Sequence, residues 1–280
     1  YLFKNSPVAK ELTALVVSQV LKVDYKEIIN NMKLISEDML FSTKTLDSRT
    51  DMMLETDKYY VNIEFCYTRG STRQKQMDSY VFEIFMSQLR KTQDYKSMKN
   101  ILQIMIENYE YFGRGEFSYE VGFMEKKLHI PEDELITKFH LSLDNLKEMD
   151  YTSIINEKDV LKRLLYIFVC DEDSLDKAYR GDKFMEKVIK TAREIAGKEK
   201  IPLYLTEDEI RKLDREEAVQ EGYDSGYDAG KRDGVALGVE QNRLEMIMNM
   251  YHDNVDINII AKYSNLLVED VEKIIEKNKE

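Results

Sequence analysis

The sequence contains few of the residues that mark several common protein classes. Of its 280 residues only two are cysteines, Cys66 and Cys170, three are prolines and none is tryptophan. Two isolated cysteines exclude a disulfide scaffold and favour a reducing compartment. The longest apolar run, residues 164–170, is far shorter than the ~18 residues of a membrane span, and the first helical segment lacks the apolar core of a signal peptide. We therefore expect a soluble, cytoplasmic protein that does not contact a membrane.

The chain also lacks an excess of positive charge, since 53 acidic residues outnumber 41 lysines and arginines. The formal net charge is −12 and the isoelectric point is near 5.0, which ordinarily opposes nucleic-acid binding because phosphates repel carboxylates. The charge is uneven, however, since residues 201–280 hold 10 basic and 19 acidic residues and so carry −9 of the total. Between Tyr67 and Asn100, seven basic residues stand against three acidic ones. This local excess of positive charge indicates either a surface that binds a phosphate backbone or the solvated face of a helix. The acidic tail, in contrast, favours contact with protein.

The hydrophobic pattern predicts helices and strands in a mixed order. Helical spacing of apolar residues covers 8–23 and 74–89 and dominates 157–196, while strands are predicted at 48–54, 59–67, 101–106, 117–124 and 138–143. The turn-rich residues 55–58 join the first two strands into a hairpin. This order predicts an α/β or α+β core with a helical extension.

Three segments are predicted along the chain: a main domain at 1–205, a glycine-repeat helix or linker at 206–243, and a C-terminal helical hairpin at 244–280. Thr206 to Glu209 form a capping box, which predicts the start of a helix. The five glycines of the repeat stand four residues apart (Gly222, Gly226, Gly230, Gly234 and Gly238). Such a stripe allows another helix to approach closely and to form a homo-oligomer; the alternative is a loose, charged linker.

The terminal hairpin has helix-turn-helix spacing around Ser264 and Asn265. Its second helix carries Glu269, Asp270 and Glu272, whose carboxylates oppose DNA phosphates. We therefore expect this hairpin to dock a partner or to cap the long helix.

Several catalytic motifs are absent from the sequence. It contains no Gly-Lys-Ser/Thr phosphate loop, no complete dinucleotide fingerprint and no Gly-x-Ser-x-Gly elbow. His129, His140 and His252 have no metal-ligand spacing with each other or with the cysteines. We expect these histidines at the surface or at the edge of the core.

The predicted hairpin is the strongest candidate for a site. Asp51 lies in the first strand, and the second alternates so that Val61, Ile63 and Phe65 point to one face while Glu64 points to the other. Two converging carboxylates offer the hard oxygen ligands that Mg²⁺ or Mn²⁺ prefers, and such an ion can activate water against a phosphodiester. Alternatively, both are ordinary solvated strand residues.

The hairpin also resembles a known family. Ser48 to Met53 followed by Val61 to Cys66 resembles the signature of the PD-(D/E)XK nuclease family transposases, the bacterial recombination-promoting nucleases. Further likeness covers nearly the whole chain: Phe3-Lys4 with Lys10 to Leu12, Gln88 to Tyr95 with Ile101 to Ile106, His140 to Asp144, and the glycine repeat with its terminal hairpin. The resemblance implies a restriction-endonuclease-like core, in which a mixed central sheet is flanked by helices.

The resemblance also assigns roles to residues. Asp51 and Glu64 match the metal-binding carboxylates, and Glu11 matches an acidic residue of the first helix. The third active-site position is lysine in the wider superfamily and usually glutamine in this group, but here it is Cys66, whose neutral thiol is only a weak donor. The arginine and tyrosine that open the family's second helix are kept in part, as Arg73 and Tyr80 at altered spacing.

These observations predict a magnesium- or manganese-dependent DNA endonuclease in which Asp51, Glu64, Cys66 and Glu11 form the catalytic site. Arg69, Arg73 and Lys75 are the candidate DNA-binding residues. The alternative is a catalytically inactive relative that binds DNA or protein.

Overall fold

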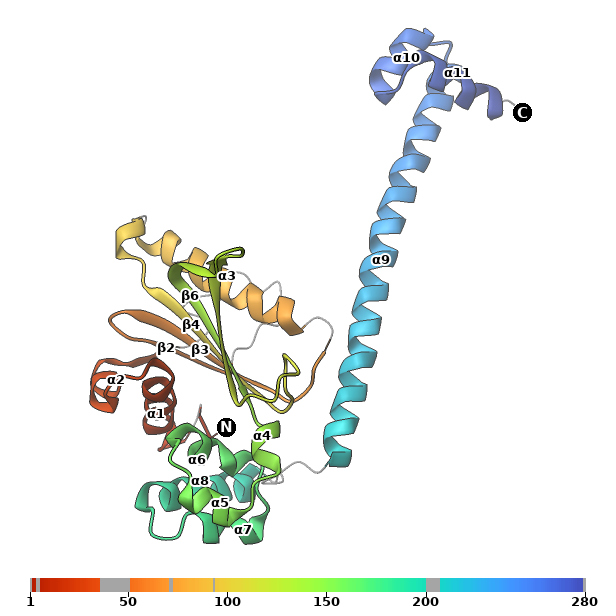
Figure 1. Ribbon diagram of the computed structural model, residues 1–280. Coiled ribbons are helices and arrows are strands. Elements are labelled where there is room, and N and C mark those ends of the chain that lie inside the picture. The colour runs from red at the N-terminus through yellow and green to blue at the C-terminus, as the bar shows by residue number, and fades with distance from the viewer. Residues whose placement is uncertain are drawn as a thin grey trace. The chain divides into compact units, whose positions relative to one another are not determined.

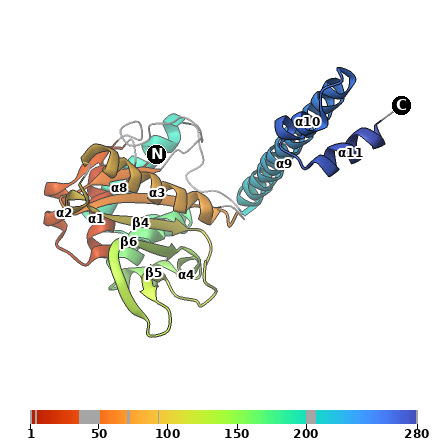
Figure 2. The ribbon, with the colours of Figure 1, turned by 90° about the horizontal axis from the view of Figure 1, so that it is seen from above.

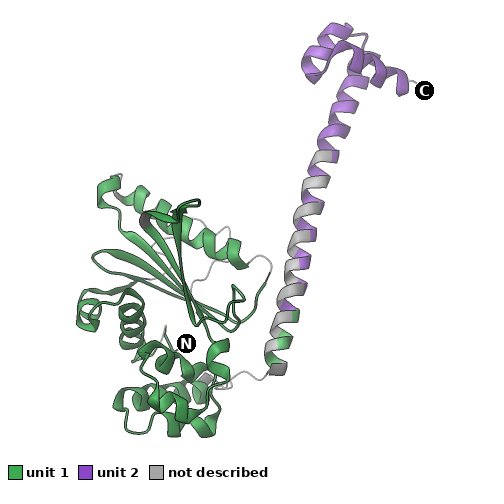
Figure 3. Ribbon diagram, in the orientation of Figure 1, with its two compact units in different colours: residues 1–215 green, residues 216–280 purple. Residues whose placement is uncertain are grey.

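The computed structural model describes residues 2–3, 6–35, 51–70, 73–92, 94–199 and 207–278. The chain divides into two compact units, residues 1–215 and 216–280 (Figure 3). Residues 48–50, at the start of a predicted strand, and Thr206 of the predicted capping box lie outside the described residues.

A mixed sheet forms the centre of the first unit (Figure 1). The described residues form six strands in the order β1-β2-β3-β4-β6-β5. The strands are β1 (Lys33–Ile35), β2 (Met52–Glu55), β3 (Tyr59–Cys66), β4 (Asn100–Glu107), β5 (Ser118–Glu125) and β6 (Ile130–Ser142). Neighbours β1–β2, β2–β3 and β5–β6 are antiparallel, whereas β3–β4 and β4–β6 are parallel.

Helices pack on both faces of this sheet (Figures 1 and 2). One face carries α3 (Arg73–Thr92), which provides the crossover between the parallel strands β3 and β4. The other face carries a helical layer, and short helices η2 (Tyr95–Ser97) and α4 (Asp144–Lys147) lie in connections. The helical layer consists of α1 (Ala9–Leu21), α2 (Tyr25–Asn31), α5 (Tyr151–Asn156), α6 (Val160–Leu165), η3 (Tyr166–Phe168), α7 (Glu172–Ala178) and α8 (Lys183–Glu199).

The main hydrophobic core lies between the sheet and the helical layer. Val61 and Ile63 of β3 and Leu102 and Ile104 of β4 are fully buried there, against apolar residues of the layer such as Leu12. The opposite face of β3 is also buried, because α3 covers it. Strands that pair in parallel with helices on both faces are usually buried on both sides. The predicted α/β class, the mixed sheet flanked by helices and the helical C-terminal part are confirmed.

The second unit is helical. It contains most of α9 (Glu207–His252), a single helix of 46 residues, followed by α10 (Ile257–Ser264) and α11 (Val268–Lys277). A small core joins the end of α9 to the last two helices through Ile247, Ile260, Ala261, Val271 and Ile275. Asn265 ends α10 with a φ of 56°, a left-handed conformation that asparagine tolerates well. The glycine repeat lies inside α9 and is therefore helical.

No membrane-spanning helix is found. Within the described ranges, no helix combines sufficient length with the apolar character needed to cross a membrane.

The glycine repeat of α9 gives a testable prediction. At each of the five glycines an added Cβ would meet no heavy atom of the described residues within 4 Å, apart from the neighbouring backbone of α9 itself. Replacing Gly226, Gly230 and Gly234 by alanine should therefore stabilise the isolated helix by about 0.5 to 1 kcal/mol per residue. Thermal unfolding followed by circular dichroism measures this change.

The solution mass of the same variant tests the predicted homo-oligomer. If a second copy packs on the glycine stripe, the added methyl groups should dissociate it, and light scattering should report a lower mass. An oligomer of unchanged mass would contradict packing through the glycines. Gly197→Ala, which also meets no atom within 4 Å, is the control outside the repeat.

Candidate functional site

The antiparallel pairing of β2 with β3 brings two carboxylates to the same face of the sheet. Met52 pairs with Ile63, so the same register sets Asp51 opposite Glu64. Side chains of directly opposed residues point to the same face. In addition, Asp51 Oδ2 accepts a hydrogen bond from the backbone amide of Phe65 at 2.8 Å. This bond fixes the Asp51 carboxylate against β3, next to Glu64.

Glu64 lies in a buried and strongly acidic environment. It is 5% exposed, and its Oε1 atom is buried without a hydrogen-bond partner in the part of the chain that the structure describes. Burial, and then the negative charge of Asp51, raise the pKa of Glu64 to about 8, against the smaller opposing effects of Asn62 and Arg73. In the absence of a bound metal ion, the Glu64 side chain is therefore mostly protonated at neutral pH.

Cys66 extends the same face by one further step of the strand. Its side chain packs against Met77 and Tyr80 of α3 and Met105 of β4. Burial raises the pKa of the Cys66 thiol to about 12, with a further rise from the charge of Glu107. The thiol is therefore neutral, and it is not an activated nucleophile.

Arg73, at the start of α3, is the cation whose charge reaches this cluster. Its positive charge opposes the rise in the pKa of Glu64, of Cys66 and of the Tyr80 phenol. The pKa of Tyr80 is nevertheless raised to about 12, by burial first and by the charge of Glu64 second. Arg73 and Tyr80 thus share one electrostatic environment with both carboxylates, although their spacing in the sequence differs from that of the family.

A buried pair of a glutamate and a histidine lies beside Cys66. Glu107 of β4 is the register partner of Cys66, and its Oε2 atom lies 3.1 Å from Nδ1 of His140 on β6. Both side chains are almost fully buried. Burial, together with the charge of Glu107 and a hydrogen bond to it, raises the pKa of the neighbouring Tyr109 phenol. His140 is thus a buried, hydrogen-bonded residue of the sheet, and the expectation of a surface or core-edge position was wrong for it.

Only a weak signal in the sequence marks Glu107 and His140. Glu107 directly follows the apolar run of β4, where a charged residue is unusual, and His140 interrupts the apolar residues of β6. Their contact depends on β4 pairing with β6, although β5 lies between them in the chain. Local patterns do not reveal such a pairing.

The predicted basic residues lie just after β3. Arg69 and Lys75 are exposed, and Arg69 donates from Nη2 to the backbone oxygen of Tyr111 at 3.0 Å. Together with Arg73 they follow the strand that carries Glu64 and Cys66. Of the three, Arg73 is close enough for its charge to act on Glu64.

Glu11 occupies a different environment. It lies on α1, in the helical layer, where its carboxylate pairs with Lys187 of α8 at 3.1 Å. Its charge contributes to the raised pKa of Tyr25. The structure does not join Glu11 to the Asp51–Glu64 pair through a contact of the described residues, and its catalytic role stays a prediction.

Comparisons with family models, with curated proteins and with solved structures give no match to this chain. Among the described residues, no group of three or more His, Cys, Asp or Glu side chains is arranged to hold a metal ion. The site therefore offers a pair of carboxylates with buried polar neighbours, and not a complete protein cage.

The buried state of Glu64 predicts a pH-dependent stability. The folded protein keeps the Glu64 proton up to about pH 8, whereas its usual pKa is 4.5. Since the folded state binds more protons between these values, stability falls as the pH rises through them, by at most about 1.4 kcal/mol per unit for this group. Glu64→Gln should remove this dependence in metal-free protein and raise the stability at pH 9, as measured by urea unfolding with EDTA.

Glu120→Gln is the matched control, because Glu120 is exposed on β5. It should keep the pH dependence of the parent. The same slope in Glu64→Gln as in the parent would contradict a buried, protonated Glu64.

Proposed function

We propose that the chain is a Mg²⁺- or Mn²⁺-dependent DNA endonuclease with a restriction-endonuclease-like core, related to the PD-(D/E)XK nuclease family transposases. The observation that carries the proposal is the opposition of exposed Asp51 and buried Glu64 on one face of the β2–β3 hairpin. The mixed sheet with helices on both faces supports the proposed core. The resemblance of the sequence around these two residues supports the proposed family.

The residues present fit a divalent cation. Mg²⁺ is commonly held by one or two carboxylates and keeps several of its waters, so a third protein carboxylate is not required. Glu64 Oε1 is buried and has no hydrogen-bond partner among the described residues, which leaves an oxygen available as a ligand. A cation between Asp51 and Glu64 also offsets the repulsion that raises the pKa of Glu64.

When bound, such an ion lowers the pKa of a coordinated water and neutralises charge on the phosphate. The protein side chains would then have distinct tasks. Asp51, held by the amide of Phe65, and Glu64 would hold the ion. Arg73 would supply the fixed positive charge that Cys66 lacks, since its charge already acts on Glu64 and Cys66. Arg69 and Lys75 would contact DNA phosphates near the end of β3.

Nicking of supercoiled plasmid tests this proposal. The purified chain should nick the plasmid with Mg²⁺ or Mn²⁺, and Asp51→Asn or Glu64→Gln should lower the rate by roughly 100-fold or more, because each removes a ligand whose effect is worth several kcal/mol. Gel electrophoresis of the relaxed product measures the rate.

Glu120→Gln serves as the matched acidic control and should nick at the parental rate. Glu11→Gln tests the assisting role of Glu11, which requires a measurable loss of activity in a protein of unchanged stability. Equal nicking by the parent and by both carboxylate variants would show a contaminating nuclease and refute the proposal.

The second candidate is a catalytically inactive relative that binds DNA or protein. Cys66 favours it, because a neutral, buried thiol with a pKa near 12 cannot replace a lysine ammonium or a glutamine amide as a donor. The endonuclease requires that Arg73 and the two carboxylates suffice for phosphodiester hydrolysis, whereas the inactive relative requires that they do not.

Replacement of Cys66 distinguishes the candidates. If the parent is inactive, Cys66→Lys or Cys66→Gln should create metal-dependent nicking, since either residue restores a strong donor beside Glu64. Cys66→Ser, which has nearly the same size as cysteine, should change little. If the parent is active and Cys66→Lys nicks no faster, the cysteine at the third active-site position does not limit the nicking rate.

A further inference from the structure

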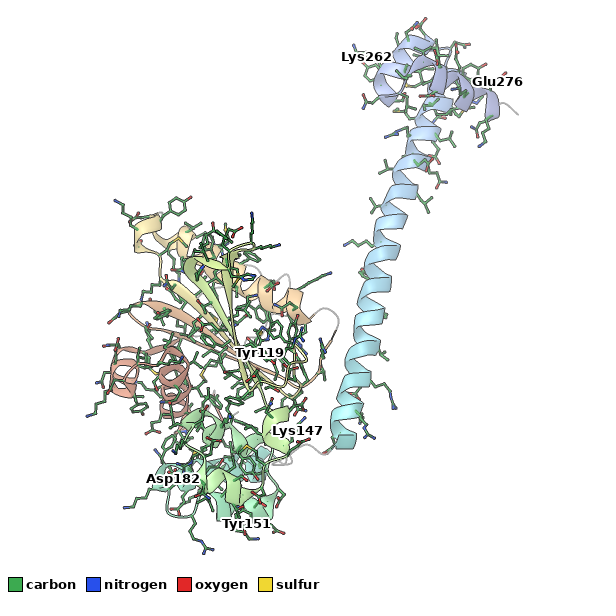
Figure 4. All side chains as sticks on the ribbon, viewed as in Figure 1. Tyr119, Lys147, Tyr151, Asp182, Lys262 and Glu276 are labelled. Atoms are coloured by element: carbon green, nitrogen blue, oxygen red, sulfur yellow. The ribbon has the colours of Figure 1, made fainter. Side chains whose placement is uncertain are left out.

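A cleft in the helical layer combines positive charge with apolar surface. It has a volume of about 580 Å³ and is lined by residues of α5, α6, α7 and the loop before α8. Tyr151 and Asp182, which Figure 4 labels, mark two of its walls. Small-molecule sites commonly have volumes of about 300 to 1,000 Å³. The cleft is therefore large enough for a nucleotide-sized ligand.

The charges that line the cleft are mainly positive. Arg163, Lys177 and Arg180 line it, against the single carboxylate of Asp182. Neither Lys177 nor Arg180 forms an ion pair with a carboxylate of the described chain. Two cations of the cleft are thus available to an anion in a chain whose net charge is −12.

Asp182 offsets charge only at Arg163 and leaves Lys177 and Arg180 unpaired by it, because both of its oxygens are engaged elsewhere. Oδ1 accepts from the backbone amides of Phe184 and Met185 at the start of α8, at 3.2 and 3.1 Å. Oδ2 accepts from Nη2 of Arg163 at 3.4 Å. The negative charge is therefore shared between a helix N-terminus, which favours it, and Arg163.

Arg163 presents part of its side chain to the cleft. It lines the cleft, and its side chain is 35% exposed. The exposed part of the guanidinium can therefore donate to an oxygen-bearing ligand, whereas the buried Nε atom lies away from the open space.

The remaining wall is apolar and aromatic. Ile155 is 50% exposed although it is a large hydrophobic residue. The Lys177 ammonium lies 5.5 Å from the centre of the Tyr151 ring, a cation–π distance. The ring and Ile155 together give a surface on which a flat organic group can lie beside the cations.

We propose that this cleft binds a small organic phosphate with a flat ring, such as a mononucleotide. Arg163, Lys177 and Arg180 bind the phosphate groups, and Tyr151 and Ile155 contact the ring. The inference does not depend on the proposed nuclease, because the cleft lies in the helical layer, whereas Asp51 and Glu64 lie on the face that α3 covers.

Isothermal titration calorimetry of the full chain tests the proposal, with ADP, inorganic pyrophosphate, adenosine and a short DNA duplex as probes. ADP should bind at least tenfold more tightly than pyrophosphate or adenosine, because only ADP contacts both the cations and the apolar surface of Tyr151 and Ile155. Lys177→Ala and Arg180→Ala should each weaken ADP binding by about tenfold or more, the usual effect of losing a charged hydrogen bond. Arg163→Lys should weaken it as well, since lysine keeps the charge but lacks the planar guanidinium that binds a phosphate through two donors.

Lys190→Ala is the matched control, because Lys190 is an exposed lysine of α8 that does not line the cleft. It should bind ADP like the parent, and circular dichroism should show that all variants are folded. Absence of ADP binding at about 1 mM, or equal binding by all variants, would overturn the proposal. Binding of the duplex instead of ADP, lost in Lys177→Ala, would replace the nucleotide site by a DNA contact. Equal affinity for pyrophosphate and ADP would overturn the role of Tyr151 and Ile155.

Discussion

The register between β2 and β3 is the constraint on which the candidate site depends. Asp51 and Glu64 share a face only while Met52 stays opposite Ile63, because a slip by one residue turns every side chain of a strand to the other face. The hydrophobic core holds this register. Val61 and Ile63 are fully buried against the helical layer, and a slip would exchange them for Asn62 and Glu64. The apolar face of β3 thus determines where the acidic face lies.

Burial of polar groups on the α3 side of the sheet has a cost that the apolar side offsets. Glu64, Gln103, Glu107 and His140 all lie there with little solvent exposure, and buried charges destabilise a fold unless they are paired. Glu107 and His140 pair with each other, and Gln103 donates to the backbone oxygen of Met77 on α3. Among the described residues, Glu64 Oε1 has no partner, and the same holds for Gln103 Oε1 and for both polar atoms of Asn62 on this face. Of these residues only Glu64 carries a carboxylate that a cation could neutralise.

The elements that the sequence predicted correctly are those that local patterns control. The helix at 8–23, the hairpin and the strand at 101–106 correspond to α1, to β2 with β3, and to β4, since periodicity and a turn specify each of them. The pairing of β4 with β6 is different, because β5 lies between them in the chain and ends at the edge of the sheet. That pairing decides which residues meet Glu107. The sequence alone therefore predicts the wrong environment for His140. It also does not predict the cleft around Arg163, because the residues that line this cleft come from four separate segments.

The uneven charge of the chain also bears on both proposed phosphate sites. Because the net charge of the chain is −12, its long-range field repels an approaching phosphate, while Arg69, Arg73 and Lys75 at one proposed site and Lys177 and Arg180 at the other would attract it at contact distance. Salt screens interactions beyond a Debye length of about 8 to 10 Å far more than contacts. Moderate salt therefore weakens the repulsion first and the direct ion pairs second. The affinity of this chain for phosphate should accordingly fall less steeply with ionic strength than that of a uniformly basic protein. Salt weakens the attraction at the site, but it also weakens the long-range repulsion, and the two effects partly offset each other.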